Sequence, residues 1–241
     1  MANWFSRLAR TPRRTDAPRL RSRGVDQLTT KVELVEFTPD LLGFLGRSAY
    51  VQLMVFENLS RAISTAPSTA AKTAMGRAAE LSLAKHRRLV AEIVRAGDDP
   101  ATVMESFTRV VDDFERDTRG ADWFETVVAC YLTAGFLDDF FARLALGLPD
   151  ETGRRIAAIF SGESGEAVLA ELLTSAIDEN PRLSARLAMW GRRLVGDMML
   201  MARSALRYTD NHKSDEARIE PVFTELIAAH TRRMDALGLT A

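Results

Sequence analysis

Residues 68–97 read STAAKTAMGRAAELSLAKHRRLVAEIVRAG. A stripe with alternating steps of four and three residues runs through this stretch, at Met75, Ala79, Ser82, His86, Leu89 and Ile93. Such steps place side chains on one face of an α-helix. Ser68 is a suitable N-cap, and Gly97 with the turn that follows it ends the segment. The stretch therefore predicts a long amphipathic helix over about residues 69–96.

The same period continues on both sides of this segment. It predicts six further helical segments, at about residues 46–65, 103–114, 122–147, 149–179, 181–208 and 215–237. Pro and Gly fall mostly between them, and Gly162 and Gly165 weaken the segment 149–179. Only residues 32–37 show a weak strand pattern. Seven helices without a credible sheet predict an all-α bundle.

Composition narrows the class of protein. The chain has 241 residues, of which 46% are apolar and 27% are charged, so collagen-like and disordered classes are excluded. The single cysteine, Cys130, excludes an internal disulfide and a cysteine-based zinc site, and we expect it to be a packed core thiol. No apolar run is long enough for a membrane span. We expect a cytoplasmic protein.

Charge is distributed unevenly along the chain. Residues 1–24 contain seven arginines and one aspartate, whereas the whole chain has a net charge of -1. Pro12, Pro18 and Gly24 interrupt this segment. We predict a flexible basic arm over residues 1–30 and a single helical domain over residues 31–241. The arm could attract RNA or another anionic partner; a solvated tail without a partner is the alternative.

Six carboxylates fall at positions where the helical period predicts apolar side chains: Glu57, Asp138, Asp139, Glu163, Glu166 and Asp197. A carboxylate buried without a partner is strongly destabilising, so each of these needs a cation, a hydrogen-bond donor or a proton. Arginine can supply the cation, as Arg143 could one turn after Asp139. A metal ion held by several of these groups is the other solution.

A metal site of this kind has a recognisable spacing. Helical bundles hold two metal ions with one Glu from each of two helices and a Glu-x-x-His pair from each of the other two. Here Leu83 stands three residues before His86, and the second pair has Glu163 and Glu166 without a histidine. Carboxylates with one imidazole suit iron or manganese. The sequence predicts an incomplete metal site made of Glu57, His86, Glu163 and Glu166, with Asp138 as a fifth candidate.

Longer motifs connect the chain with a known family. They include KHRRL at residues 85–89, DWFE at 122–125, LAMWGRRLVGD at 187–197 and HTRRMDALGL at 230–239. On these motifs the chain resembles, over about residues 46–239, the actinobacterial ferritin-like proteins related to the tRNA 2-methylthio-isopentenyladenosine hydroxylases. The resemblance implies a ferritin-like four-helix bundle core with flanking helices. For the tRNA hydroxylases it also implies a di-iron centre that activates dioxygen.

The resemblance carries over to only part of that centre. Three of the six ligand positions match, at Glu57, His86 and Glu163. The others hold Leu83, Ala134 and Glu166, and among these only Glu166 could supply an oxygen ligand. Asp138, one turn from Ala134, could compensate for the missing ligand.

Two functions follow from these observations. In the first, the bundle has lost its metal site and is non-catalytic, acting through its surfaces as a homo-oligomer or as a partner-binding module. In the second, it is an iron- or manganese-dependent oxygenase with a modified, mononuclear site, acting on modified tRNA. What separates the two is whether the predicted ligands converge on one point.

Overall fold

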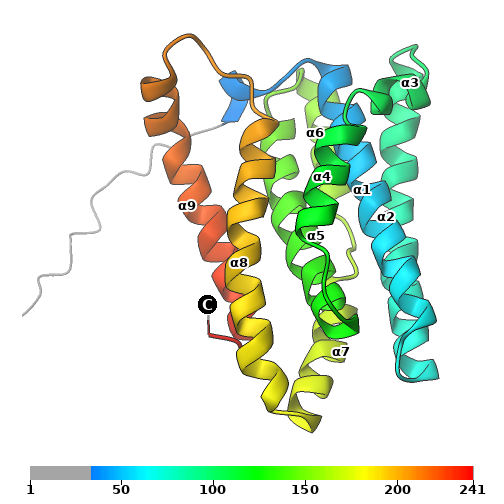
Figure 1. Cartoon of the computed structure of the whole chain (residues 1–241). Coiled ribbons are helices and arrows are strands. Elements are labelled where there is room, and N and C mark those ends of the chain that lie inside the picture. The colour runs from blue at the N-terminus through cyan, green and yellow to red at the C-terminus, as the bar shows by residue number, and fades with distance from the viewer. Residues whose placement is uncertain (1–33, 241) are drawn as a thin grey trace, which may run out of the picture. The chain divides into compact units, whose positions relative to one another are not determined.

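The computed structural model describes residues 34–240, and within them every regular element is helical (Figure 1). The all-α prediction is therefore confirmed. A short 3-10 helix, η2, occupies Leu34–Phe37. The α-helices are α1 Leu41–Ser64, α2 Thr69–Arg95, α3 Pro100–Glu105, α4 Thr108–Asp117, α5 Trp123–Ala145, α6 Asp150–Phe160, α7 Glu166–Glu179, α8 Arg182–Ser204 and α9 His212–Ala236. The predicted arm, residues 1–30, lies outside the described residues.

Side-chain caps determine where several helices begin. Ser68 Oγ accepts a hydrogen bond from Ala71 N at 3.1 Å, as the sequence predicted for the start of α2. Asp122 Oδ1 accepts one from Glu125 N at 2.9 Å at the start of α5. Each cap satisfies a backbone N–H that has no partner inside its own helix.

Helix α5 lies in the middle of the bundle (Figure 1). It packs against α1, α6, α7, α8 and α9, and its side chains are buried on nearly all sides. A helix that is apolar around its whole circumference must lie in the interior. Its Phe141 packs with Phe44 of α1 and Phe160 of α6, with ring centroids 5.7 and 5.5 Å away. The core is thus built around α5.

Two predicted helices are each divided in the structure. The segment 103–114 spans parts of α3 and α4, and the segment 149–179 is two helices, α6 and α7, separated by residues 161–165. Residues 34–37, which showed a weak strand pattern, form a 3-10 helix. The break between α6 and α7 brings the backbone of Gly165 against Ala78 of α2: a Cβ on Gly165 would lie 2.5 Å from Ala78 Cβ. Glycine at this position therefore allows the α6–α7 connection to lie directly on α2.

None of the helices in residues 34–240 combines the length and the hydropathy that crossing a membrane requires.

Candidate metal centre

An ion pair lies buried in the middle of the bundle, between α2 and α5. Lys85 Nζ contacts Asp138 Oδ2, and Gln52 Nε2 of α1 donates a hydrogen bond to Asp138 Oδ1 at 2.8 Å. All three residues are buried. Burial raises the pKa of Asp138, and the Lys85 ammonium and the Gln52 amide oppose that rise. Both oxygens of this carboxylate are therefore engaged by side chains of the chain itself.

A small cavity of about 20 Å³ adjoins this pair, with room for a water molecule. Four helices, α1, α2, α5 and α7, contribute to its wall, and its polar lining includes Gln52, Ser82, Lys85, Tyr131, Asp138 and Glu166. Leu169 of α7 lies on the same wall. No histidine is among the cavity-lining residues.

Glu166, the first residue of α7, is held by an arginine from α9. Arg233 Nε donates to Glu166 Oε1 at 3.1 Å, and its Nη1 donates to Asp139 Oδ2 at 2.9 Å. Gly135 of α5 makes room for this guanidinium, because a Cβ there would lie 2.2 Å from Arg233 Nε. Arg233 thus joins α5, α7 and α9 beside the cavity and neutralises Glu166.

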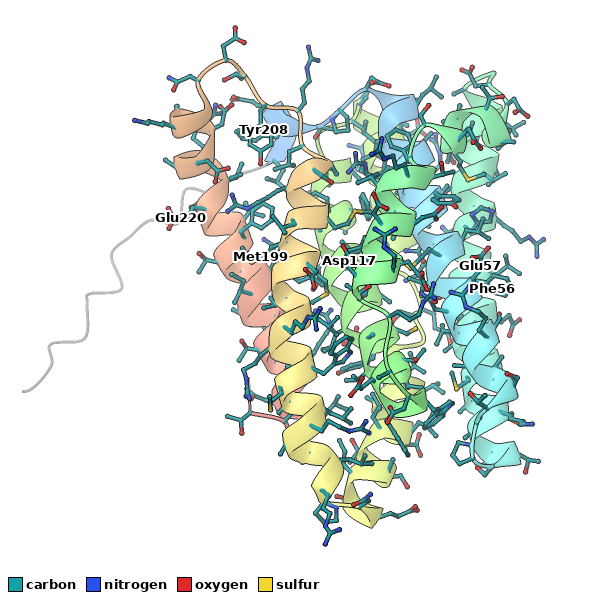
Figure 2. All side chains as sticks on the ribbon, viewed as in Figure 1. Phe56, Glu57, Asp117, Met199, Tyr208 and Glu220 are labelled. Atoms are coloured by element: carbon teal, nitrogen blue, oxygen red, sulfur yellow. The ribbon has the colours of Figure 1, made fainter. Side chains whose placement is uncertain are left out.

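Two of the predicted ligands point into solvent. Glu57 is exposed on the outer side of α1 (Figure 2). Glu163 is also exposed, lies in the break before α7, and accepts a hydrogen bond from Arg77 Nη2 at 3.0 Å. Neither side chain lines the cavity.

His86 lies in the seam between α1 and α2. Its Nδ1 donates a hydrogen bond to the backbone carbonyl of Ala49 at 2.9 Å, and the ring is half-buried. It does not line the cavity. Of the five predicted ligands, only Asp138 and Glu166 line the same cavity, and Glu57, His86 and Glu163 lie elsewhere. Within residues 34–240 no three His, Cys, Asp or Glu side chains gather where they could hold a metal ion.

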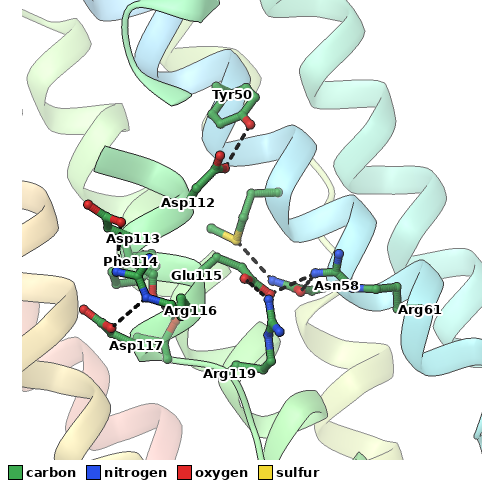
Figure 3. A network of polar contacts seen from close by, with 12 residues as sticks. Tyr50, Asn58, Arg61, Asp112, Asp113, Phe114, Glu115, Arg116, Asp117 and Arg119 are labelled. Carbon is green, nitrogen blue, oxygen red and sulfur yellow. Dashed lines mark hydrogen bonds and ion pairs between the residues drawn. The ribbon is translucent and has the colours of Figure 1, made fainter. Parts of the chain in front are cut away.

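Glu57 lines a different polar region, which α1 shares with α4. Figure 3 shows the network of polar contacts in this region. Glu115 accepts hydrogen bonds from Arg61 Nη2 at 2.9 Å and from Arg119 Nη2 at 2.6 Å, which ties α4 to α1. Tyr50 Oη donates to Asp112 Oδ1 at 2.9 Å; burial and this hydrogen bond raise the pKa of Tyr50 to about 12. Glu115 is thus paired with two arginines, so we assign this network a structural role.

Cys130 is buried on α5, as expected from the sequence. Burial raises the pKa of its thiol to about 12, which keeps it protonated and unreactive at neutral pH.

Comparison with protein families gives one match. The family described as the ferritin-like domain of actinomycetes matches residues 34–213, which is most of the chain and covers α1–α8. The chain belongs to this family. No curated protein matches the chain.

The cavity wall has positions with the spacing of a metal centre in a helical bundle. The pattern of one carboxylate on each of two helices and an i, i+3 pair on each of the other two fits the cavity wall. Gln52 and Asp138 are the single positions, and the pairs are Ser82 with Lys85 and Glu166 with Leu169. Two of these six positions, Asp138 and Glu166, retain a carboxylate.

Lys85 and Gln52 were not among the residues predicted to form the site. The signal was present in the spacing. Gln52 follows Leu45 and Ala49 by seven and three residues, and all three are buried on one face of α1. A helical stripe through these three residues predicts that Gln52 faces the core.

Proposed function

We propose that this ferritin-like domain is a metal-independent binding protein, in which the Lys85 ammonium supplies the positive charge that a metal ion would bring to the cavity. The observation that carries the proposal is the buried contact of Lys85 with Asp138, completed by Gln52. These three side chains line the cavity at which α1, α2, α5 and α7 converge.

The charge balance of the cavity supports this proposal. Its two carboxylates, Asp138 and Glu166, are paired with Lys85 and Arg233 respectively. Two like unit charges about 4 Å apart repel by about 4 kcal/mol at an effective dielectric constant of about 20, and a divalent ion doubles that repulsion. A metal ion in the cavity would have to displace the ammonium or bear this cost.

The atoms that the cavity residues could offer to a metal ion also support a metal-independent function. Iron and manganese sites in bundles use carboxylate oxygens and imidazole nitrogens. Among the six cavity positions, Leu169 has no donor atom, and Lys85 offers only a protonated amine. These residues do not fit a di-metal centre.

The partner that we propose is a polyanion such as RNA. This part rests on the seven arginines within residues 1–24, whose positive charge would be attracted to phosphates. A metal-dependent hydroxylase acting on modified tRNA, as the sequence resemblance implies, is the competing function. The observation that favours it is that Asp138 and Glu166 still lie on one cavity.

Metal analysis distinguishes the two functions. The full chain is purified without chelators from cells supplied with iron and manganese, beside an Asp138→Asn/Glu166→Gln variant and an exposed-site control, Glu57→Gln/Glu163→Gln. We expect background metal in all three, measured by plasma mass spectrometry. Stoichiometric metal in the wild type that is lost only in the Asp138→Asn/Glu166→Gln variant would overturn the proposal.

Binding is measured on the same preparations. We expect a fluorescent single-stranded RNA to bind the full chain and to lose affinity steeply as salt rises. Replacing Arg13, Arg14, Arg19, Arg21 and Arg23 by serine should flatten this salt dependence, and Arg→Lys changes at the same positions should preserve it. Equal binding by the serine and wild-type proteins would exclude the arm as the RNA-binding element.

A further inference from the structure

The outer face of α8 carries apolar side chains that no element within residues 34–240 covers. Met189 and Leu200 are each 68% exposed, and Gly196 lies between them. A Cβ added to Gly196 would meet no atom within 4 Å. Two exposed apolar side chains do not by themselves mark a binding surface, so the arrangement of the residues around them decides whether this face can bind another molecule.

These residues form one stripe along the helix. Met189, Arg193, Gly196 and Leu200 follow one another in steps of four, three and four residues, which is the spacing of one helical face. The opposite face of α8 contains Leu187, Leu194 and Met198 and packs into the core. The stripe therefore points directly away from the bundle.

Charge is arranged along one edge of this stripe. Arg193 and Asp197 are one turn apart on the same edge, and the Arg193 guanidinium lies 5.3 Å from the ring centroid of Trp190. Within the described part of the chain, no hydrogen bond or ion pair engages the Asp197 carboxylate. On the other edge, Arg192 Nη1 donates to the Thr240 carbonyl at 2.5 Å and is engaged within the chain.

We propose that this face of α8 binds the same face of a second copy of the chain, with the two helices antiparallel about a twofold axis. The axis passes α8 midway between Leu194 and Val195. Met189 and Leu200 lie equally far from that point on either side, so Met189 packs on Leu200 of the partner subunit, and the reverse contact forms by symmetry.

The charges meet their complements in the same arrangement. A twofold axis perpendicular to the two helices keeps the Arg193–Asp197 edge of both on one side of the contact. Measured along the direction of the helices, Arg193 then lies within about 1.5 Å, the rise of one helical residue, of Asp197 of the partner subunit. A parallel pair would instead place Arg193 against Arg193 of the partner subunit.

Gly196 allows this contact to be close. It lies about two residues from the axis, where the backbones approach most nearly, and helices that cross at glycine pack at short interaxial distance. One helix face from each copy is a small interface, so we expect a reversible dimer that dissociates on dilution.

Gly196→Gln tests the proposal without disturbing the monomer, because the new side chain has open space around it. Gly76→Gln is the matched control: Gly76 also lies inside a helix, α2, with no atom within 4 Å of its Cβ position. By sedimentation velocity of the full chain, we expect Gly196→Gln to weaken dimerisation by at least about tenfold and Gly76→Gln to leave it unchanged. A monomeric wild type, or a dimer equally insensitive to both substitutions, would overturn the proposal.

A charge exchange tests the antiparallel register. Arg193→Asp and Asp197→Arg should each be monomeric, because each places like charges across the twofold axis. An equimolar mixture of the two should form a heterodimer, since the carboxylate introduced by the first substitution then faces the guanidinium introduced by the second. Circular dichroism confirms that both variants are folded. Failure of the mixture to associate while the wild type dimerises would rule out this pairing.

Discussion

Asp138 is a buried carboxylate whose two oxygens are both engaged by side chains. It is buried on the central helix, and its charge is compensated by a single ammonium group, that of Lys85. Breaking a buried ion pair costs far more than the pair contributes, because the remaining charge is left in a medium that solvates it poorly. The stability of the bundle therefore depends on Lys85 in a way that a surface lysine would not show.

Lys85→Met retains the length of the side chain and removes the charge. We expect the free energy of unfolding to fall by about 3–5 kcal/mol, since Asp138 must then be buried as an unpaired carboxylate or take up a proton. Urea denaturation at neutral pH measures the loss. The double variant Lys85→Met/Asp138→Leu should recover most of it, and a single variant as stable as the wild type would contradict the buried-pair assignment.

His230 makes the stability of the bundle depend on pH. It is 3% exposed on α9, and burial together with the nearby Arg233 lowers its pKa from 6.5 to about 4. Between these two values the unfolded chain binds a proton that the folded chain does not. The contribution of His230 is complete above pH 6.5 and is lost progressively as the pH falls toward 4.

His230→Gln removes this titration. We expect the wild type to lose stability with a slope of up to about 1.4 kcal/mol per pH unit from this residue below pH 6.5. The variant should show a shallower slope, whatever its stability at pH 7. Urea midpoints at pH 5 and pH 7 give the comparison, with His86→Gln as a half-buried control. Parallel slopes in wild type and His230→Gln would show that the histidine does not titrate in this range.

At the scale of elements, the connection between α6 and α7 determines how α7 meets α2. Gly165 contacts Ala78 so closely that any side chain would push α7 away from α2, and Glu166 at the start of α7 would move with it. Gly162, in the same connection, has more space: its nearest neighbour to a Cβ would be 3.4 Å away.

Gly165→Ala should therefore destabilise the bundle by about 1–3 kcal/mol, the usual cost of overpacking, whereas Gly162→Ala should change its stability little. Thermal denaturation of the two variants makes the comparison. Equal melting temperatures for both would mean that the α6–α7 connection can relax away from α2.

At the scale of the whole molecule, positive charge is concentrated in the N-terminal part of the sequence, and the remainder of the chain is acidic. Residues 1–24 are strongly basic, and the rest of the chain is acidic enough to bring the total to -1. If α8 pairs two copies as proposed, each dimer brings two basic arms to one polyanion. Two linked arms bind more tightly than one wherever both can reach the same strand.

The helical segments and the all-α class were predictable from the sequence because they depend on local spacing, and the start of α2 was predictable because it depends on the single residue Ser68. The centre of the bundle was not. On α2 the predicted stripe is buried at every position except His86, which is half-buried, and the buried charge at that level belongs to its neighbour Lys85. Neighbouring residues on a helix differ by about 100° in direction, so the spacing alone does not decide which of two adjacent side chains enters the core. On α1 the prediction likewise selected the exposed Glu57 over the buried Gln52.

The sequence by itself thus determined which segments are helical and that acidic side chains needed partners. Only the tertiary structure decided which partners they have. Lys85 and Asp138 are 53 residues apart in sequence, and Glu166 and Arg233 are 67 apart. Nothing in the spacing along a single helix records contacts of this kind, because they arise when α2, α5, α7 and α9 pack around one core.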